Sequence, residues 1–343
     1  MNIKKLVKKN VSLLKAYNAK DIPCRIKLDA NESPYGFNDE LKLPAGIDIN
    51  RYPDPEAGIL KKSLTKSPGV KQENILLGNG SDELIYYLAT TFGGPVLYPL
   101  PTFSMYGIIS QALGEKKIEI PLDDNFDLDT KAILSAIKQE KPGLIFLSSP
   151  NNPTGNCFST DRILKIIKAS KGIVVVDEAY QPFAGGKSFL RFLGDYRNLV
   201  IMRTLSKIGL AALRLGFMIA DPEIIGEVNR VRLPFNINSL SQATAVEVLK
   251  DKKRLNTSVR RIVSERNRML KQMEGIKGIR PFPSEANFIL FRVANPDKVY
   301  RALLKNGILI RNTHDMINGC LRVTIGKPEE NEAFLEALRR ISS

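Results

Sequence analysis

The chain has 343 residues, with 51 Lys and Arg against 36 Asp and Glu, a formal net charge of +15 and a single histidine, His314. Its composition, 43% hydrophobic and 25% charged, is ordinary for a globular protein, and its length suits two domains or one large domain with a smaller one. One histidine excludes a multi-histidine zinc site, and acid–base catalysis would then depend on Lys, Asp, Glu or Tyr.

From about residue 55 to residue 220, short apolar runs alternate with segments of helical periodicity. The runs LIFL, IVVV and LVIM lack polar alternation, which is typical of strands buried on both faces of a mostly parallel sheet. An α/β fold with right-handed crossovers is therefore expected. The predicted helices cover 56–66, 83–92, 103–113, 129–139 and 159–169, and the predicted strands cover 74–77, 95–99, 116–121, 143–148, 172–180, 198–204 and 213–220.

The pattern changes after residue 235, which predicts a smaller α+β domain. We expect a large domain over 46–235, and a small domain made of 1–45, which includes an N-terminal arm, and 236–343. The predicted helices here cover 239–249, 252–273, 297–305 and 329–341, and the predicted strands cover 286–293, 307–311 and 320–326.

Positive charge is concentrated in two segments. Residues 1–20 hold six lysines and no acid, and residues 250–271 hold nine basic side chains against two acidic ones. Neither segment interleaves aromatic residues with its bases, and no nucleic-acid-binding signature is present. A solvated, lysine-rich helix face is favoured, and a nucleic-acid-binding protein is kept as a remote alternative.

The three cysteines are odd in number and widely spaced, as expected for free thiols in a reducing compartment. No apolar stretch follows the basic N-terminus, so no signal peptide is expected there. The longest uncharged stretch is broken by prolines and a Gly-Gly pair, which excludes a membrane helix. These features predict a cytoplasmic protein.

Polar segments follow several predicted strands at the point where each strand ends. Ligands of α/β proteins bind beyond the carboxyl ends of the strands, so these segments predict a site. The first, 78–82, opens a helix whose free N–H groups suit an anion. The others are SPNNPTGN at 149–156, DEAY at 177–180, and LSK at 205–207, which is followed by Arg214. Each segment alone is also ordinary turn or cap chemistry, but their joint occurrence at strand ends favours a site.

SPNNPTGN, VVVDEAY and RTLSKIGLAALRLG resemble motifs of the pyridoxal-phosphate aminotransferases of fold type I, and the resemblance covers nearly the whole chain. LDANESPYG, NRYPDP, YPLPTFSMY and CLRVTIGKPEE narrow it to the histidinol-phosphate aminotransferase family. The resemblance implies a large domain with a mostly parallel sheet, and transamination of L-histidinol phosphate with 2-oxoglutarate to imidazole acetol phosphate and L-glutamate. Two relatives of the same fold, threonine-phosphate decarboxylases and aromatic-amino-acid aminotransferases, remain alternatives.

The resemblance also implies roles for individual residues around pyridoxal 5′-phosphate. Lys207 would bond the cofactor and move protons, Asp177 would hold the proton on the ring nitrogen, and Tyr180 and Asn152 would hydrogen-bond O3′. Phe103 would stack on the ring. The phosphate would be bound by the helix start and its neighbours: Gly80, Ser81, Asp82, Ser206, Arg214 and, from a neighbouring subunit of a homodimer, Tyr52.

For the substrate, Arg322 matches the arginine that binds a carboxylate, and the phosphate of histidinol phosphate would take the same place. Arg311 and Tyr17 resemble supporting contacts, although Arg311 also fits an ordinary exposed strand end. Two positions depart from the family pattern: Lys207 and Arg214 are seven residues apart rather than eight, and Phe103 replaces a tyrosine. A tightened loop would still let Arg214 reach the phosphate.

Overall fold

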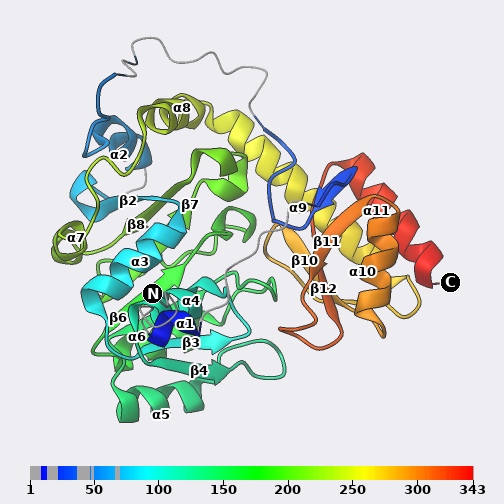
Figure 1. The fold of residues 1–343 in the computed structure, drawn as a ribbon, viewed down its shortest axis with the longest axis horizontal. Coiled ribbons are helices and arrows are strands. Elements are labelled where there is room, and N and C mark those ends of the chain that lie inside the picture. Colours follow the sequence, from blue (N-terminus) through cyan, green and yellow to red (C-terminus); the bar gives the residue numbers. More distant parts are fainter. Residues whose placement is uncertain (1–8, 14–21, 37–46, 48–49, 66–69, 343) are drawn as a thin grey trace, which may run out of the picture.

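The computed structural model describes residues 9–13, 22–36, 47, 50–65 and 70–342. Two β-sheets with flanking helices lie next to each other, and the long helix α9 (Lys252–Glu274) extends from one to the other (Figure 1). The larger sheet is mostly parallel and its strands alternate with helices, which confirms the predicted α/β class.

The large sheet has seven strands in the order β2-β8-β7-β6-β5-β3-β4. β8 pairs antiparallel with both of its neighbours, and the other pairs are parallel. Every strand except β8 therefore ends at the same edge, where β8 begins. The strands are β2 (Ile75–Asn79), β3 (Val96–Leu100), β4 (Lys117–Pro121), β5 (Leu144–Ser148), β6 (Ile173–Asp177), β7 (Leu199–Thr204) and β8 (Leu215–Ile219).

Helices cover both faces of this sheet, so successive side chains of its strands enter two different cores. Val174 and Val176 of β6 pack in one core and Val175 in the other, which explains why the strand is apolar throughout. The first core includes side chains from α2 (Gly58–Leu64), α5 (Thr130–Glu140), α6 (Thr160–Ala169) and α8 (Ser239–Lys250). The second includes side chains from α3 (Ser81–Phe92), α4 (Met105–Leu113) and α7 (Pro222–Asn229).

The small sheet has the order β1-β11-β12-β10-β9, and only the β1–β11 pair is parallel. Its core is shared with α9, α10 (Pro296–Lys305) and α11 (Pro328–Ser342). The first buried side chain of α9, Leu255, packs in a core of the large sheet, and Ile262 and Met269 pack in the small core. The strands are β1 (Ile26–Leu28), β9 (Arg280–Pro281), β10 (Phe288–Arg292), β11 (Ile308–Asn312) and β12 (Cys320–Thr324).

The predicted domain limits stay a prediction. α8 lies beyond the predicted limit at residue 235, yet its Ala245 and Val248 pack in a core of the large sheet. Several short elements were not expected from the sequence: β1, β9 and α7, the helical turn α1 (Lys9–Ser12), and the 3₁₀ turns Gln72–Asn74, Gln181–Phe183, Leu190–Phe192, Ser206–Ile208 and Ala211–Leu213. None of the helices within the described ranges is long and apolar enough to span a membrane.

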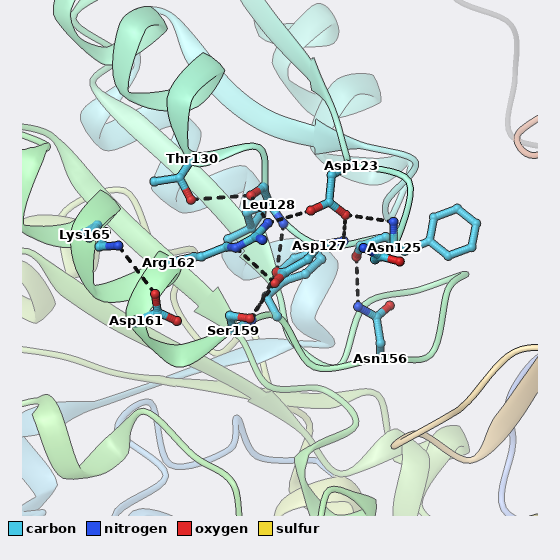
Figure 2. A network of polar contacts seen from close by, with 12 residues as sticks. Asp123, Asn125, Asp127, Leu128, Thr130, Asn156, Ser159, Asp161, Arg162 and Lys165 are labelled. Carbon is cyan, nitrogen blue, oxygen red and sulfur yellow. Dashed lines mark hydrogen bonds and ion pairs between the residues drawn. The ribbon is translucent and has the colours of Figure 1, made fainter.

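A polar network holds the loop that follows β5 (Figure 2). Arg162 of α6 donates to Asp123 Oδ2 and to the Leu128 carbonyl, both at 2.7 Å, and its Nε lies 3.3 Å from Asp127 Oδ2. Asp127 also accepts the backbone N–H of Ser159 at 3.1 Å, and Asn156 donates to the Phe126 carbonyl at 2.9 Å. The segment 156–162 is therefore fixed to the β4–α5 connection, which anchors the far end of the 149–156 loop.

Candidate active site

The structure brings most of the predicted site residues together at the edge where the parallel strands end. A cavity of about 110 Å³ lies there. It is lined by the predicted residues Lys207, Asp177, Tyr180, Asn152, Ser81, Asp82, Phe103, Ser206 and Arg214. The residues come from the segments after β2, β3, β5, β6 and β7 and from the start of β8. This agrees with the general position of ligand sites in α/β folds.

Asp177 is the last residue of β6 and is 3% exposed. Its Oδ2 accepts a hydrogen bond from the Tyr106 hydroxyl at 2.6 Å, and its Oδ1 accepts one from the Ala179 N–H at 3.0 Å. Burial raises the pKa of Asp177 to about 6, although these two hydrogen bonds lower it. Burying the ionised carboxylate therefore costs free energy unless a positive group lies beside it. A cationic group bound in the cavity would supply that partner.

The start of α3 and Arg214 form the polar end of this cavity. Gly80 has a φ of 84°, and a Cβ there would lie 2.5 Å from Nη2 of Arg214, so a larger residue would displace the guanidinium. Arg214 itself has a φ of 52° and its Nη2 lies 3.3 Å from Asp82 Oδ2. Free N–H groups of a helix start, hydroxyl groups and a guanidinium together form a donor set for a phosphate.

The short interval between Lys207 and Arg214 is accommodated by two consecutive 3₁₀ turns. Lys207 is half-buried; its Nζ lies 3.4 Å from the Ala30 carbonyl and 5.8 Å from the centre of the Tyr180 ring. Phe103 packs edge-on against Tyr106, with ring centres 5.7 Å apart. The amine and one aromatic face thus share a cavity with the Asp177 carboxylate.

A second cavity, of about 360 Å³, shares Phe103, Asn152, Tyr180 and Lys207 with the first and extends toward the small sheet. Its new lining includes Arg322 on β12 and Arg311 on β11, which are paired in register. The Arg322 side chain donates to Asn152 Oδ1 and to the Asp29 carbonyl, the latter at 2.7 Å. Arg322 is 8% exposed, whereas Arg311 is exposed. Both cations suit an anionic substrate group.

Two predicted residues are not placed at this site. Tyr17 lies outside the described residues. Tyr52 is 82% exposed and stacks on Phe235 with ring centres 4.7 Å apart, and it lines neither cavity. The single histidine, His314, accepts the Gly319 N–H at Nδ1 over 3.0 Å and so closes the turn before β12.

Sequence reasoning missed three residues that hold the site. Tyr106 donates to Asp177, and its position within YPLPTFSMY was the only signal for it. Asn151 is fully buried and donates to the Pro101 carbonyl and accepts from Thr102, which joins the loops after β3 and β5. Asn31, within the segment LDANESPYG, donates to the Tyr180 hydroxyl at 3.0 Å.

The chain is similar in sequence and in fold to known proteins. Residues 24–338 match the family described as aminotransferase class I and II. The histidinol-phosphate aminotransferase of Aquifex aeolicus is 44% identical over 346 aligned positions, covering 97% of each chain. The structure of the Clostridium acetobutylicum histidinol-phosphate aminotransferase superimposes with a TM-score of 0.83 at 28% identity, over 92% of this chain and 99% of that one. The Sinorhizobium meliloti enzyme, solved with pyridoxal-5′-phosphate, has a TM-score of 0.85 at 24% identity, over 98% and 97%.

Burial of Asp177 predicts a pH-dependent stability in protein prepared without any bound small molecule. The pKa of this carboxyl rises from an ordinary 3.8 to about 6 on folding, so the folded state loses stability as pH rises between these values. The loss amounts to about 3 kcal/mol at most. The Asp177→Asn variant has no ionisable group at this position and should not lose this stability. Its free energy of unfolding, relative to that of the wild type, should therefore increase from pH 4 to pH 7.5.

Denaturant unfolding of both proteins across this range measures the difference. The value at pH 4 serves as the internal control, because both side chains are then neutral in the folded state. Stability curves that stay parallel from pH 4 to pH 7.5 would contradict the argument.

Proposed function

We propose that this chain, which belongs to the aminotransferase class I and II family, transaminates L-histidinol phosphate with 2-oxoglutarate. The products are imidazole acetol phosphate and L-glutamate, and the reaction is a step of histidine biosynthesis. The observation that carries the proposal is the convergence of Lys207, Asp177 and Arg322 on two connected cavities, in a chain so similar to histidinol-phosphate aminotransferases.

The chemistry of the lining residues fits pyridoxal 5′-phosphate. The α3 start, Ser206 and Arg214 would hold its dianionic phosphate, and the buried Asp177 carboxylate would hold a protonated ring nitrogen. Asn152 Oδ1 accepts from Arg322, so the Asn152 amide nitrogen is left to donate to the phenolic O3′. The bound cofactor supplies an electron sink for the charge that develops at the substrate Cα.

Lys207 performs the proton transfer in this proposal. Its Nζ would hold the cofactor covalently and, as a free amine, would take the proton from the substrate Cα as a base and give it up again as an acid. The Ala30 carbonyl, 3.4 Å from Nζ, gives the amine a hydrogen-bond acceptor on the side of the second cavity. Asp177 would favour a protonated ring nitrogen, because the buried carboxylate would gain a positive partner there.

Arg322 would bind both substrates in turn: the phosphate of histidinol phosphate and a carboxylate of 2-oxoglutarate. Its guanidinium is fixed by bonds to Asn152 and to the Asp29 carbonyl, and it packs over the Phe288 ring with Cζ 5.1 Å from the ring centre. The planar guanidinium, held in this way, can donate two parallel hydrogen bonds to either anion. Arg311, its exposed register partner, adds positive charge at the mouth of the cavity.

A homodimer is part of the proposal. Tyr52, Leu233 and Phe235 are 82%, 62% and 39% exposed, and Tyr52 stacks on Phe235. Arg232 bonds the Pro55 carbonyl at 2.8 Å, so the two segments lie against each other and present one apolar surface. We call these three side chains the aromatic–Leu patch. A patch of this kind suits an interface with a second copy, through which Tyr52 would reach the partner's cofactor phosphate.

A cytoplasmic location also belongs to the proposal. Cys157 and Cys320 are free thiols, and burial raises the pKa of Cys157 to about 12, which keeps that thiol protonated. Free thiols of this kind suit a reducing compartment.

The substrate assay tests the proposed function directly. Incubation with histidinol phosphate, 2-oxoglutarate and pyridoxal phosphate should yield glutamate, whereas threonine phosphate should release no CO₂ and aromatic amino acids should react more slowly. Lys207→Ala should reduce turnover at least about 1,000-fold, because both the covalent link and the proton carrier are lost. Glutamate formation at the wild-type rate by this variant, or faster turnover of either rival substrate, would overturn the proposal.

Substitutions at Arg322 test anion binding. Arg322→Ala should lower kcat/KM for both substrates about 100-fold or more, since a buried charged hydrogen-bonding partner is removed. Arg322→Lys keeps the charge but not the fork, and should recover only part of the loss. Arg311→Ala, at an exposed position, should cost less than either. Steady-state kinetics at fixed co-substrate measure all three, and equal losses for Arg311→Ala and Arg322→Ala would contradict the assignment.

The aromatic–Leu patch can be tested by measuring the mass of the protein in solution. Charge placed on the patch by Leu233→Glu together with Phe235→Glu should convert a particle of two chains to one of a single chain at micromolar concentration, because a buried charge opposes association. Ala169→Glu, on the exposed end of α6, is the matched control and should leave the mass unchanged. Light scattering after gel filtration gives the mass; a two-chain particle in the double variant would place the interface elsewhere.

A further inference from the structure

Asn31 occupies an unusual position between the two sheets. It follows β1, is 1% exposed, and has a φ of 55°, a conformation that Asn and Gly tolerate better than other residues. Its amide reaches Tyr180, in the segment after β6, and Thr324, the last residue of β12. Burying a polar side chain costs free energy unless its hydrogen-bonding groups are satisfied. The hydrogen bonds of Asn31 must therefore offset both its burial and its left-handed backbone conformation.

The hydrogen bonds around Asn31 have a defined direction. The Asn31 backbone N–H donates to Thr324 Oγ1 at 2.9 Å, and the Thr324 hydroxyl donates to Asn31 Oδ1 at 3.1 Å. With Oδ1 facing Thr324, Asn31 Nδ2 points to the Tyr180 hydroxyl oxygen and donates to it at 3.0 Å. The opposite orientation of the amide would leave the Thr324 hydroxyl, on a residue 2% exposed, without this acceptor.

This direction determines where the Tyr180 proton can go. An amide nitrogen cannot accept a hydrogen bond, so the Tyr180 hydroxyl, which accepts from Asn31, must direct its own hydrogen elsewhere. Tyr180 lines both cavities and packs edge-on against Phe288, with ring centres 5.1 Å apart, which restricts the ring. The hydroxyl hydrogen is therefore available to an acceptor in the cavity.

We propose that Asn31 and Thr324 are positioning residues that direct the Tyr180 hydroxyl proton into the cavity, toward the phenolic oxygen of the cofactor. The proposal rests on the function proposed above, because the acceptor is pyridoxal phosphate. Both residues act through Tyr180. They also link the two sheets, because Thr324 ends a strand of the small sheet, Asn31 follows another, and Tyr180 follows a strand of the large one.

The test is the pH dependence of the visible absorption of the holoenzyme. A hydrogen bond donated to O3′ stabilises its negative charge and so favours loss of the proton shared with the lysine–cofactor linkage. Asn31→Asp replaces the donor by a carboxylate oxygen, which would accept the Tyr180 proton and withdraw it from the cofactor. We expect the midpoint of the spectral transition to rise by about one pH unit or more, as expected for loss of a hydrogen bond to a charged group.

Three further variants separate this effect from a general change of charge or structure. Tyr180→Phe should raise the midpoint, and Asn31→Asp should add little in the Tyr180→Phe background, because both act on one hydrogen bond. Thr324→Val should raise the midpoint by a smaller amount, since the Asn31 amide loses the group that orients it. Thr324→Ser keeps the hydroxyl and should leave the midpoint at the wild-type value.

An unchanged midpoint in both Asn31→Asp and Thr324→Val would overturn the proposal, as would an equal shift by Asn31→Asp with and without the Tyr180 hydroxyl. Should Asn31→Asp fail to fold, Thr324→Val and Thr324→Ser still decide. Failure of the proposed function is a separate outcome: the wild type itself would then show no visible band with pyridoxal phosphate and no transamination.

Discussion

Burial of one carboxylate at the end of the central strand β6 determines the polar surroundings of the cavity at the strand ends. Water is excluded from Asp177, so two hydrogen bonds and a positive ligand must replace its hydration. Tyr106 supplies one of those bonds from α4, and burial beside the carboxylate raises the pKa of Tyr106 well above its ordinary value, so it stays a donor. The large sheet provides this environment because helices cover both of its faces.

Much of this arrangement could be predicted from the sequence, because the physical signals are local. The apolar runs of β5, β6 and β7 and the polar segments after them predicted the sheet and the edge at which ligands bind. The hydrogen-bond partners could not be predicted, since they join distant segments: Tyr106 and Asp177 are 71 positions apart, and Asn31 and Thr324 are 293 apart. The short strands β1 and β9 were missed because two or three residues carry no periodicity.

The positive charge of the chain has more than one structural role. Arg322 and Arg214 line the two cavities, whereas Arg266 of α9 is buried and donates to the Phe183 and Ala286 carbonyls at 3.2 and 3.0 Å. That arginine lies in the basic stretch 250–271, so part of this stretch joins α9 to the turn Gln181–Phe183 and to the segment before β10 instead of remaining solvated. The arginines that match the family motifs therefore account for only a small part of the net positive charge.

The reversed direction of β8 has a consequence for how the site tolerates change. Lys207 leaves the end of β7, and Arg214 enters β8 at the same edge, so both belong to one closed hairpin connection whose ends are fixed by antiparallel pairing. A change in the length of this connection cannot be absorbed at one end alone. An insertion or deletion would have to be accommodated inside the connection, as the two 3₁₀ turns accommodate the interval here, and would displace Lys207 relative to Arg214.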